Sequence, residues 1–480
     1  MNLNDYAKLD AIALAEAIAR GDYSTEEVIE TSIEAIEALN PQLNAVVMKN
    51  YDGARSIAAT AAAADGPLAG VPFLIKDVNV FTGDMPTTFS CRFFDGVAPR
   101  PDSEIVRRWR AAGLVVMGKS NTPEFAEDYV CEPSFRGATL NPWDTGMTTG
   151  GSSGGAGAAV ASGMLPMAHG TDLGGSIRIP AACCGVYGLK PTSGLNPVDA
   201  AQSELASGFN SDHVLTRSVR DSAAALDATA HPIAGYRYPV KRAVASYLGC
   251  LAESPRRLRI GVCSNTPLGE ATPPRQQQAV AKAADLLNEL GHELVAYAYP
   301  DELDFGSWMD TLWMYDVVHE INRRSDELGR RPEAGEIDAM TRYLLELVDA
   351  SSAMDHYRAR LLAHQNSVRQ MTSMAGLDLL LTPSLGSDPV SLGSFDSHSE
   401  AFDYDRWTAQ GWAFAPFSYI CNMTGQPAAS LPLRLAADEP PCAVQLAGHH
   451  GQDHLLLQVS AQLEQQLQWA DYRPPIRVGD

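Results

Sequence analysis

Residues 149–155 read TGGSSGG and residues 170–178 read GTDLGGSIR. Glycine lets a backbone turn sharply and approach a bound molecule closely, and a serine there can act as a nucleophile once a base removes its proton. The two stretches hold Ser152 and Ser176, and a candidate base, Lys76, lies upstream in the segment GVPFLIKD at residues 70–77. Burial after an apolar run would lower the pKa of this lysine and allow it to accept a proton. The pattern predicts acyl-transfer chemistry by two serines and a lysine.

Each of these features has an ordinary explanation when it is taken alone. Serine among glycines usually caps a helix or belongs to a turn, and a lysine at a strand end usually faces water. The combination of both serine motifs with the upstream lysine favours the catalytic interpretation.

The stretch from residue 141 to residue 192 resembles the core of the amidase signature family. Weaker matches lie at residues 70–77, 118–125 and 422–428. The resemblance implies that Ser176 is the nucleophile, Ser152 the bridging serine and Lys76 the base. In the implied mechanism, Lys76 takes a proton from Ser152, which takes one from Ser176. Ser176 then forms an acyl-enzyme, which water hydrolyses.

The negative oxygen of the tetrahedral intermediate needs hydrogen-bond donors, which backbone N–H groups of a glycine-rich turn can supply. The candidates for this oxyanion hole are Leu173, Gly174, Gly175 and Ser176. Asp172 and Arg178 flank the nucleophile and are expected to pair and brace its loop, with Ser153 as a further supporting residue. Lys119 and Lys190 also match motif positions and are interpreted as structural.

The charge and hydrophobicity of the chain restrict the kinds of molecule that it can bind. The chain has 480 residues and a formal net charge of −22, so the phosphates of a nucleic acid would be repelled. No run of about 18 apolar residues predicts a membrane span, and no basic segment followed by an apolar run indicates a signal peptide. We expect a cytoplasmic enzyme that can form a homodimer and whose partners are a small amide substrate and water.

The eight cysteines are scattered, and no Cys-x-x-Cys spacing occurs. Neither a zinc site nor a redox pair is therefore expected, and the predicted mechanism needs no metal and no cofactor. The cysteines are expected to be reduced and buried.

The sequence predicts an α/β fold with a large mixed, mostly parallel twisted sheet, covered by helices on both faces. Residues 1–480 are expected to form one domain, in which residues 1–65 are a peripheral N-terminal helical part. Two helices are expected within residues 10–40, with a capping box at Ser24 and an end at Pro41. Further helices are expected at 54–64, 102–112, 153–162 and 273–290, and strands at 71–75, 114–117, 258–262, 293–299 and 377–382. Residues 197–255 give mixed helix and loop signals.

The predicted function is hydrolysis of the carbon–nitrogen bond of a small aryl or apolar amide. A carbamate, ester or nylon-oligomer hydrolase with the same triad is an alternative, as is the A subunit of an amidotransferase. A remote alternative is an α/β-hydrolase, because residues 151–155 satisfy Gly-x-Ser-x-Gly with Ser153 as nucleophile, and His449, His450 or His454 could then serve as base. That motif requires a preceding strand, whereas residues 141–149 indicate a loop. The glycines at residues 150–157 could also form a phosphate-binding loop, but the Gly-Lys-Ser/Thr that such a loop needs does not follow them.

Aromatic residues outside the core motif could line a substrate pocket, although such residues more often belong to a protein core. If several line the cleft, an aryl or apolar amide is favoured. The candidates are Phe125, Tyr129, Trp308, Trp313, Tyr315, Phe402, Trp407, Trp412 and Phe414.

Overall fold

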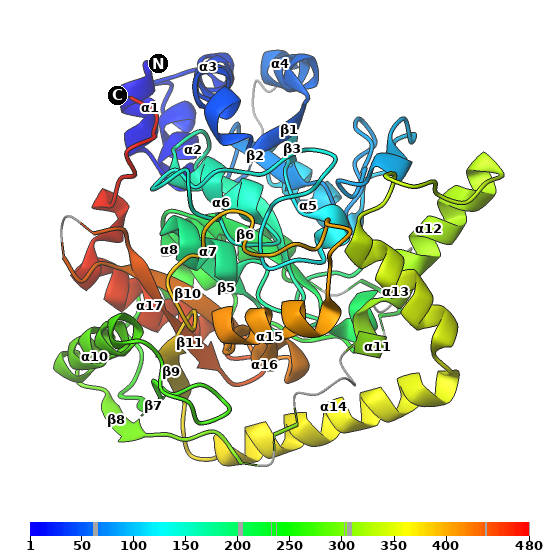
Figure 1. The fold of residues 1–480 in the computed structure, drawn as a ribbon. Helices are drawn as coiled ribbons and strands as arrows, with labels where there is room; N and C mark the ends of the chain where they lie inside the picture. Colours follow the sequence, from blue (N-terminus) through cyan, green and yellow to red (C-terminus); the bar gives the residue numbers. More distant parts are fainter. Residues whose placement is uncertain are drawn as a thin grey trace.

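A sheet of eleven strands forms the centre of the structure, a computed structural model (Figure 1). It describes residues 1–60, 66–199, 205–231, 233–236, 238–301, 303–304, 310–436 and 439–479. The strands are β1 (Val46–Lys49), β2 (Pro72–Lys76), β3 (Val115–Ser120), β4 (Met167–Asp172), β5 (Tyr187–Lys190), β6 (Ser211–Thr216), β7 (Arg259–Val262), β8 (Glu293–Ala296), β9 (Leu379–Pro383), β10 (Ala428–Leu433) and β11 (Cys442–Gly448). Across the sheet their order is β1-β3-β2-β4-β6-β5-β10-β11-β9-β7-β8.

The predicted mixed sheet is confirmed, but the expectation that it is mostly parallel is wrong. Strand β2 runs parallel to β3 and β4, and β7 runs parallel to β8 and β9. The six other pairings in the described chain are antiparallel. The prediction of a mostly parallel sheet rested on the helix followed by a strand at residues 102–117, and it assumed that the same alternation holds along the whole chain. That alternation joins parallel neighbours, whereas the central strands between β4 and β9 pair with partners that run the opposite way.

Helices cover both faces of the sheet, as predicted (Figure 1). Alternate residues of β9 show which helices pack on each face. Leu379 and Leu381 of β9 pack with α8 (Val219–Thr229), α10 (Pro274–Glu289) and α17 (Asp453–Leu467). Leu380, between them, packs on the opposite face with α14 (Ala353–Ser373) and α16 (Ser418–Met423). Successive side chains of a strand point to opposite faces. Both faces of the sheet are therefore apolar, and helices must pack on both to exclude water.

The N-terminal segment contributes four helices and one edge strand. The helices are α1 (Leu3–Lys8), α2 (Ala11–Ala19), α3 (Thr25–Leu43) and α4 (Tyr51–Thr60). Strand β1, which the sequence analysis missed, pairs with β3 and joins this segment to the sheet. The capping box at Ser24 is present, but α3 continues past Pro41 to Leu43. A proline in the last turn removes only one hydrogen bond, so it does not end the helix.

The other predicted elements are found close to their expected positions. Helix α4 covers residues 54–60 of the helix that was predicted at 54–64. Residues 61–64 of that prediction lie outside the described residues. The region without a firm prediction holds β6, α8 and α9. The remaining helices are α5 (Glu104–Ala111), α6 (Gly154–Ala161), α7 (Arg178–Cys184), α9 (Tyr247–Cys250), α11 (Asp310–Trp313), α12 (Tyr315–Leu328), α13 (Ala339–Ala350) and α15 (Tyr404–Phe414).

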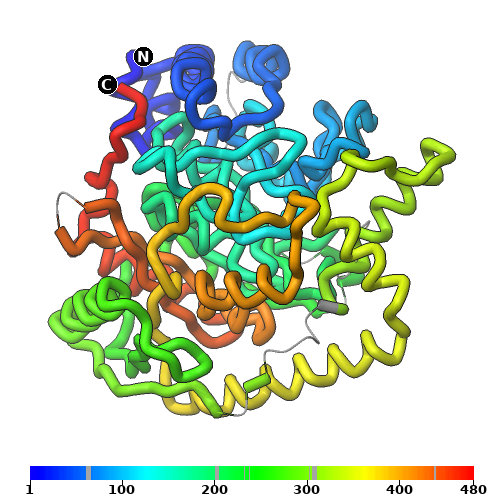
Figure 2. The backbone as a smooth tube through the Cα atoms, in the orientation of Figure 1, coloured from blue at the N-terminus to red at the C-terminus, as the bar shows by residue number. Residues whose placement is uncertain are grey.

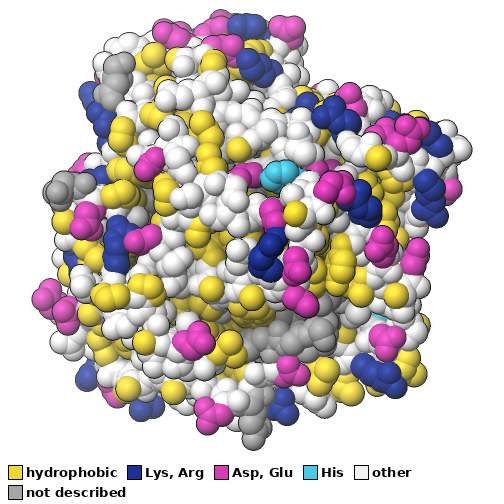
Figure 3. All heavy atoms as spheres, viewed as in Figure 1, with side chains coloured by type: hydrophobic (Ala, Val, Ile, Leu, Met, Phe, Trp, Pro, Cys, Tyr) yellow, Lys and Arg dark blue, Asp and Glu magenta, His cyan; other side chains and the backbone are white. Residues whose placement is uncertain are grey.

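The two ends of the chain lie close together (Figure 2). Asn4 and Gly479 line one surface hollow, and the N–H of Val478 donates to the carbonyl of Ser162 at 2.8 Å. Acidic and basic side chains are interspersed over the face seen in Figure 3 and do not gather in a single patch. Within the described ranges, no helix has the length and apolar character needed to cross a bilayer.

Candidate active site

Three loops at strand and helix ends bring the predicted triad together. Lys76 is the last residue of β2, Ser152 lies just before α6, and Ser176 lies between β4 and α7. The Nζ atom of Lys76 is 2.7 Å from the Oγ atom of Ser152. The N–H of Ser153 donates to the carbonyl of Ser176 at 3.1 Å and joins the two glycine-rich loops. Ser152 and Ser176 both line one cleft.

Lys76 is fully buried and forms no ion pair in the described structure. Its ammonium group donates to the hydroxyls of Ser152 and Thr171, the latter at 2.8 Å. Burial lowers the pKa of Lys76 to about 7, although the more distant charges of Asp172 and Asp212 act in the opposite direction. A substantial fraction of this lysine is therefore neutral near pH 7 and can accept a proton.

Two residues that hold Lys76 were missed by the sequence analysis. Thr171 lies inside the second quoted stretch, where its position beside the candidate oxyanion loop was the only signal. His169 lies two residues earlier on β4, and its Nδ1 atom accepts the backbone N–H of Lys76 at 3.2 Å. The other ring nitrogen of His169 lies 3.2 Å from a carboxylate oxygen of Asp212. No simple sequence spacing links these positions.

Asp172 and Arg178 form the expected ion pair, fully buried, with Nη2 of Arg178 2.8 Å from Oδ1 of Asp172. Burial opposes ionisation of Asp172, but the charge and hydrogen bonds of Arg178 outweigh it and lower the pKa of Asp172 to about 2. Arg178 also donates to the carbonyl of Ser418 and to the side chains of Gln445 and Asn422. The pair ties the nucleophile loop to α16 and β11.

The loop between Asp172 and Ser176 presents free backbone donors. Within the described chain, no acceptor contacts the N–H groups of Leu173, Gly174 and Ser176. Gly175 differs from the expectation, because its N–H donates to Oδ1 of Asp172 at 2.9 Å. Its φ is 128°, and a Cβ atom there would lie 2.5 Å from the Ser418 hydroxyl, so glycine is required for shape.

Ser153 contacts the strand that carries Thr171. Its Oγ atom donates to the carbonyl of Thr171 and accepts the N–H of Thr171, both at 3.3 Å. Residues 141–149 form a loop in which only Met147 and Thr148 take part in isolated bridges. The strand that an α/β-hydrolase nucleophile needs is absent there, so this alternative is wrong.

The remaining lysine and histidine candidates contact other parts of the structure. Lys119 donates to Thr87 and Lys190 to the carbonyl of Pro191. His449 lies 2.7 Å from the carbonyl of Leu377. None of these side chains lines the cleft at Ser176. Among the described residues, no three histidine, cysteine or acidic side chains come together as a metal site.

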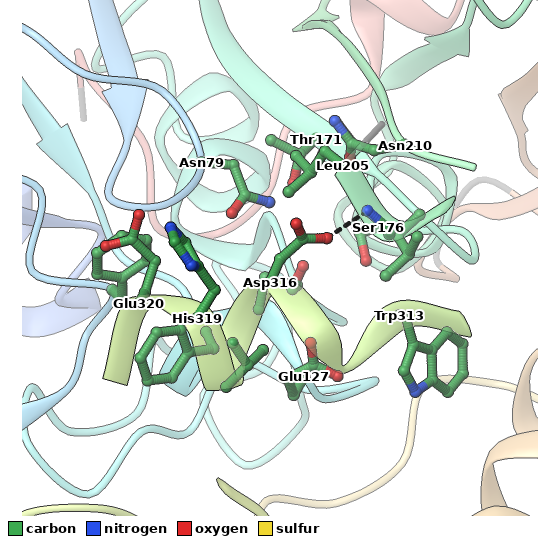
Figure 4. A pocket seen from close by; sticks show the side chains of 17 residues that line it. Asn79, Glu127, Thr171, Ser176, Leu205, Asn210, Trp313, Asp316, His319 and Glu320 are labelled. Atoms are coloured by element: carbon green, nitrogen blue, oxygen red, sulfur yellow. Dashed lines mark hydrogen bonds between the residues drawn. The ribbon is translucent and has the colours of Figure 1, made fainter. Parts of the chain in front are cut away.

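The cleft has two lobes that meet at Ser176. One lobe carries several acidic side chains and encloses about 690 Å³, and the other carries aromatic side chains and encloses about 450 Å³, both including space open to solvent. Of the aromatic candidates, Phe125, Tyr129, Trp313 and Trp407 line these lobes. Trp308 lies outside the described residues, and the other four lie elsewhere in the structure. Figure 4 shows the acidic lobe, with Asp316 near the middle of the view between His319 and Ser176.

Comparison with known proteins agrees with this geometry. The family described as Amidase matches residues 27–457. The chain belongs to the amidase family. A 6-aminohexanoate-cyclic-dimer hydrolase from Paenarthrobacter ureafaciens is 36% identical over 97% of this chain and 96% of its own length. A putative amidase, AmiC, from Mycobacterium tuberculosis is 34% identical over 97% of this chain and 96% of its own length.

Solved structures show the same fold. A 6-aminohexanoate cyclic dimer hydrolase complexed with substrate has a TM-score of 0.90 and 33% identity, and the match covers 98% of this chain and 99% of that one. A bacterial aryl acylamidase of the amidase signature family has a TM-score of 0.86 and 26% identity, with 96% and 98% covered. The α/β fold is confirmed, and the protein is an amidohydrolase that acts on amide C–N bonds.

Proposed function

We propose that the protein hydrolyses amides through an acyl-enzyme on Ser176, with Ser152 and Lys76 as the proton relay. The observation that carries this proposal is the 2.7 Å contact between Nζ of Lys76 and Oγ of Ser152, together with a pKa of Lys76 that burial lowers to about 7. A serine hydroxyl needs an adjacent base to become a nucleophile. This contact supplies that base.

The reaction proceeds in two halves. Neutral Lys76 accepts the proton of Ser152, which accepts the proton of Ser176 as the Ser176 oxygen attacks the amide carbon. The proton then returns along the same path to the amide nitrogen, and the C–N bond breaks to release the amine. Water then attacks the ester carbon while Ser152 and Lys76 accept its proton, and the relay returns that proton to the Ser176 oxygen as the C–O bond breaks and the acid leaves.

The negative oxygen of the tetrahedral intermediate is held by the unpaired N–H groups of Leu173, Gly174 and Ser176. Removing one such donor typically lowers kcat by about 10² to 10³. The buried pair of Asp172 and Arg178 keeps these groups in place, because Asp172 accepts the intervening N–H of Gly175. Gly175 therefore helps to fix the conformation of the loop, and its N–H is not a donor to the negative oxygen of the intermediate.

The substrate we propose is a small amide with an aryl or apolar acyl group. The aromatic lobe beside Ser176 is lined by Tyr129, Trp313, Trp407 and Tyr419, and aromatic linings of this kind suit an aryl or apolar group. The similarity to 6-aminohexanoate-cyclic-dimer hydrolases keeps nylon-type oligomers as the second candidate. Initial rates on benzanilides, cyclic and linear 6-aminohexanoate oligomers, esters and carbamates separate these classes.

The nucleophile is tested by labelling and substitution. We expect a fluorophosphonate probe to label Ser176, and Ser176→Ala to lose amide hydrolysis by more than about 10⁴-fold, because no other group forms the acyl-enzyme. Peptide mapping of the labelled protein identifies the site. Labelling at Ser153, or activity retained in Ser176→Ala, would contradict the assignment.

We infer that the enzyme is a single cytoplasmic domain that acts as a monomer or homodimer, without nucleic acid, metal or cofactor. The sheet takes strands from residue 46 to residue 448, which supports one domain with residues 1–65 at its periphery. The eight cysteines are free and buried, which supports a reducing compartment. The net charge of −22 supports the absence of a nucleic-acid partner.

A further inference from the structure

The two lobes of the catalytic cleft differ in chemistry. The aromatic lobe is lined by Tyr129, Ile179, Trp407 and Tyr419. The acidic lobe also has apolar lining residues, such as Phe89 and Phe125, but it adds polar and acidic side chains from three parts of the chain: Asn79, Asn210, Asp316, His319 and Glu320. Leu173, Ser176, Glu127 and Trp313 line both. A substrate bound across Ser176 therefore places its two halves in different surroundings.

The proton relay fixes which half enters which lobe. Ser152 and Thr171 line only the acidic lobe, whereas Gly151 and Gly174 line only the aromatic lobe. In the proposed function, on which this step rests, Ser152 returns the proton to the departing nitrogen. The amine half must therefore extend into the acidic lobe, and the acyl half occupies the aromatic lobe.

Glu127, which lines both lobes, and Asp316, which lines only the acidic lobe, form no ion pair with the described residues. The Glu127 side chain forms no hydrogen bond or ion pair with the described residues, and it is only partly exposed. Asp316 accepts one hydrogen bond, from the N–H of Ala206 at 2.6 Å, which is the dashed line in Figure 4. Glu320 differs, because it is paired with Arg100 and Arg323.

The electrostatics of these two groups favour a bound cation. Burial raises the pKa of Glu127 to about 8, and the charges of Asp316 and Asp128 add to this effect. Burial also raises the pKa of Asp316, although the Ala206 N–H and His319 oppose it. A positive charge placed between the two carboxylates would favour their ionised forms and would be attracted by both.

We propose that Glu127 and Asp316 form a cation-binding subsite for the leaving amine, so that the preferred substrates are N-acylated diamines with an ammonium group a few carbons from the amide nitrogen. Hydrolysis of such a substrate releases the acid from the aromatic lobe and a diamine from the acidic lobe. A leaving group that ends in a carboxylate is disfavoured at the same subsite.

The first test compares matched amides on the intact enzyme. The substrates are N-(4-aminobutyl)benzamide, its neutral analogue N-pentylbenzamide, and the anionic N-benzoyl-4-aminobutyrate. We expect kcat/KM for the cationic amide to exceed that for the neutral amide by about tenfold or more, equivalent to about 1.4 kcal/mol, and the anionic amide to be slowest. Equal rates for the cationic and neutral amides, or a faster anionic amide, would overturn the proposal.

Variants of Glu127 and Asp316 then test whether these carboxylates cause the preference for a cationic amide. The ratio of kcat/KM for the cationic over the neutral amide is expected to fall at least fivefold in Glu127→Gln and in Asp316→Asn. Glu289→Gln is the matched control, since it removes one acidic charge from the exposed end of α10, outside the cleft, and it should keep the wild-type ratio. An unchanged ratio in both cleft variants would assign the preference to other groups.

Binding to an inactive enzyme separates this inference from the proposed reaction. Calorimetry on Ser176→Ala measures Kd for the cationic and neutral benzamides without turnover. We expect the cationic compound to bind about tenfold more tightly, and Glu127→Gln in the same background to remove the difference. Equal Kd values would overturn the subsite even if Ser176 is the nucleophile, whereas a clear difference would support it even if the relay is wrong. A preference for a cation on the acyl half, measured with 4-aminobutyranilide, would reverse the orientation and contradict the assignment.

Discussion

Lys76 is a charged residue type that the fold holds entirely out of water. Desolvation penalises its ammonium form, and the two hydroxyls that contact its Nζ atom, from Ser152 and Thr171, are neutral. A carboxylate at either position would instead stabilise the charged form and raise the pKa. These neutral partners leave the pKa of Lys76 low, as its proposed role as a base requires.

The pH dependence of the reaction follows from this environment. With burial lowering the pKa of Lys76 to about 7, the lysine is protonated and inactive below that pH and neutral above it. We expect kcat/KM to rise with pH through an apparent pKa near 7, far below the value of about 10.4 for a lysine in water. Rates measured between pH 5 and pH 9.5 on one amide define the profile.

Substitutions of Lys76 give the control. Lys76→Arg should be inactive at every usable pH, because guanidinium stays protonated. Lys76→Ala should lose about 10³-fold or more on amides and less on esters, whose leaving groups need no proton to depart. An active Lys76→Arg enzyme would remove lysine from the role of base.

The site residues that could be predicted are those whose chemistry shows in a short motif. Lys76, Ser152 and Ser176 lie in glycine-rich or apolar segments whose combination in one chain indicates the site. His169 and Thr171 could not be predicted in the same way, because their roles depend on β4 lying beside β2. The commitment of the Gly175 N–H to Asp172 depends on the conformation of the loop, which no motif encodes.

At the scale of single elements, the short segment from β4 through α7 carries much of the site. Strand β4 supplies His169, Thr171 and Asp172, and the turn after it supplies Ser176 and the free N–H groups. Arg178, the first residue of α7, then closes the loop on Asp172. The segment is held by the buried ion pair of Asp172 and Arg178 and by hydrogen bonds to β2, to the loop of Ser153, to β6, to α16 and to β11.

Breaking that ion pair should destabilise the protein. Arg178→Leu leaves the Asp172 carboxylate buried without its cation, a change that typically lowers the free energy of unfolding by about 3–5 kcal/mol. Activity should fall with it, because the loop that holds Ser176 loses its brace. Urea unfolding followed by circular dichroism measures the loss.

The matched control is Arg256→Leu, whose arginine pairs with Asp378 and has a side chain that is 61% exposed. Exposed ion pairs contribute little to stability, so its effect should be much smaller. If the two variants unfold at the same urea concentration, the buried pair has no special role.

Strands that could be predicted from the sequence are those with apolar runs, such as β2 and β3. Strand β4 reads MAHGTD, a pattern without apolar alternation, yet all six of its residues are buried. Strand β6, SDHVLT, is similar, since Asp212 contacts His169 and His213 lies 2.9 Å from Ser222. The polar residues of β4 and β6 thus leave these two strands without the apolar pattern by which a strand is predicted.

At the scale of the whole molecule, the sheet order places residues distant in sequence at one site. Strand β2 lies between β3 and β4, and α12, far along the chain, brings Asp316 to the same cleft. The triad comes from the first half of the chain, whereas several lining residues of both lobes come from the second. Substrate preference can therefore vary while the catalytic segment stays unchanged.

The cysteines give a test of the fold as a whole. All eight are free and buried, from Cys91 near the N-terminal half of the sheet to Cys442 on β11. Only a thiolate reacts rapidly with a disulfide reagent, and burial raises the pKa of Cys131 to about 12 and of Cys250 to about 11. Reaction in the native state must wait for the structure to open.

We therefore expect the native protein to react slowly with Ellman's reagent and the protein unfolded in guanidinium chloride to release eight thiols without reductant. The absorbance of the released thionitrobenzoate measures both. Rapid reaction of one or more thiols in the native protein would show that a segment covering them opens readily. Fewer than eight thiols after unfolding would show a disulfide, for which the adjacent Cys183 and Cys184 are poorly placed, because bridged cysteines have Cα atoms about 4.4–6.8 Å apart, whereas neighbours along the chain are held at about 3.8 Å.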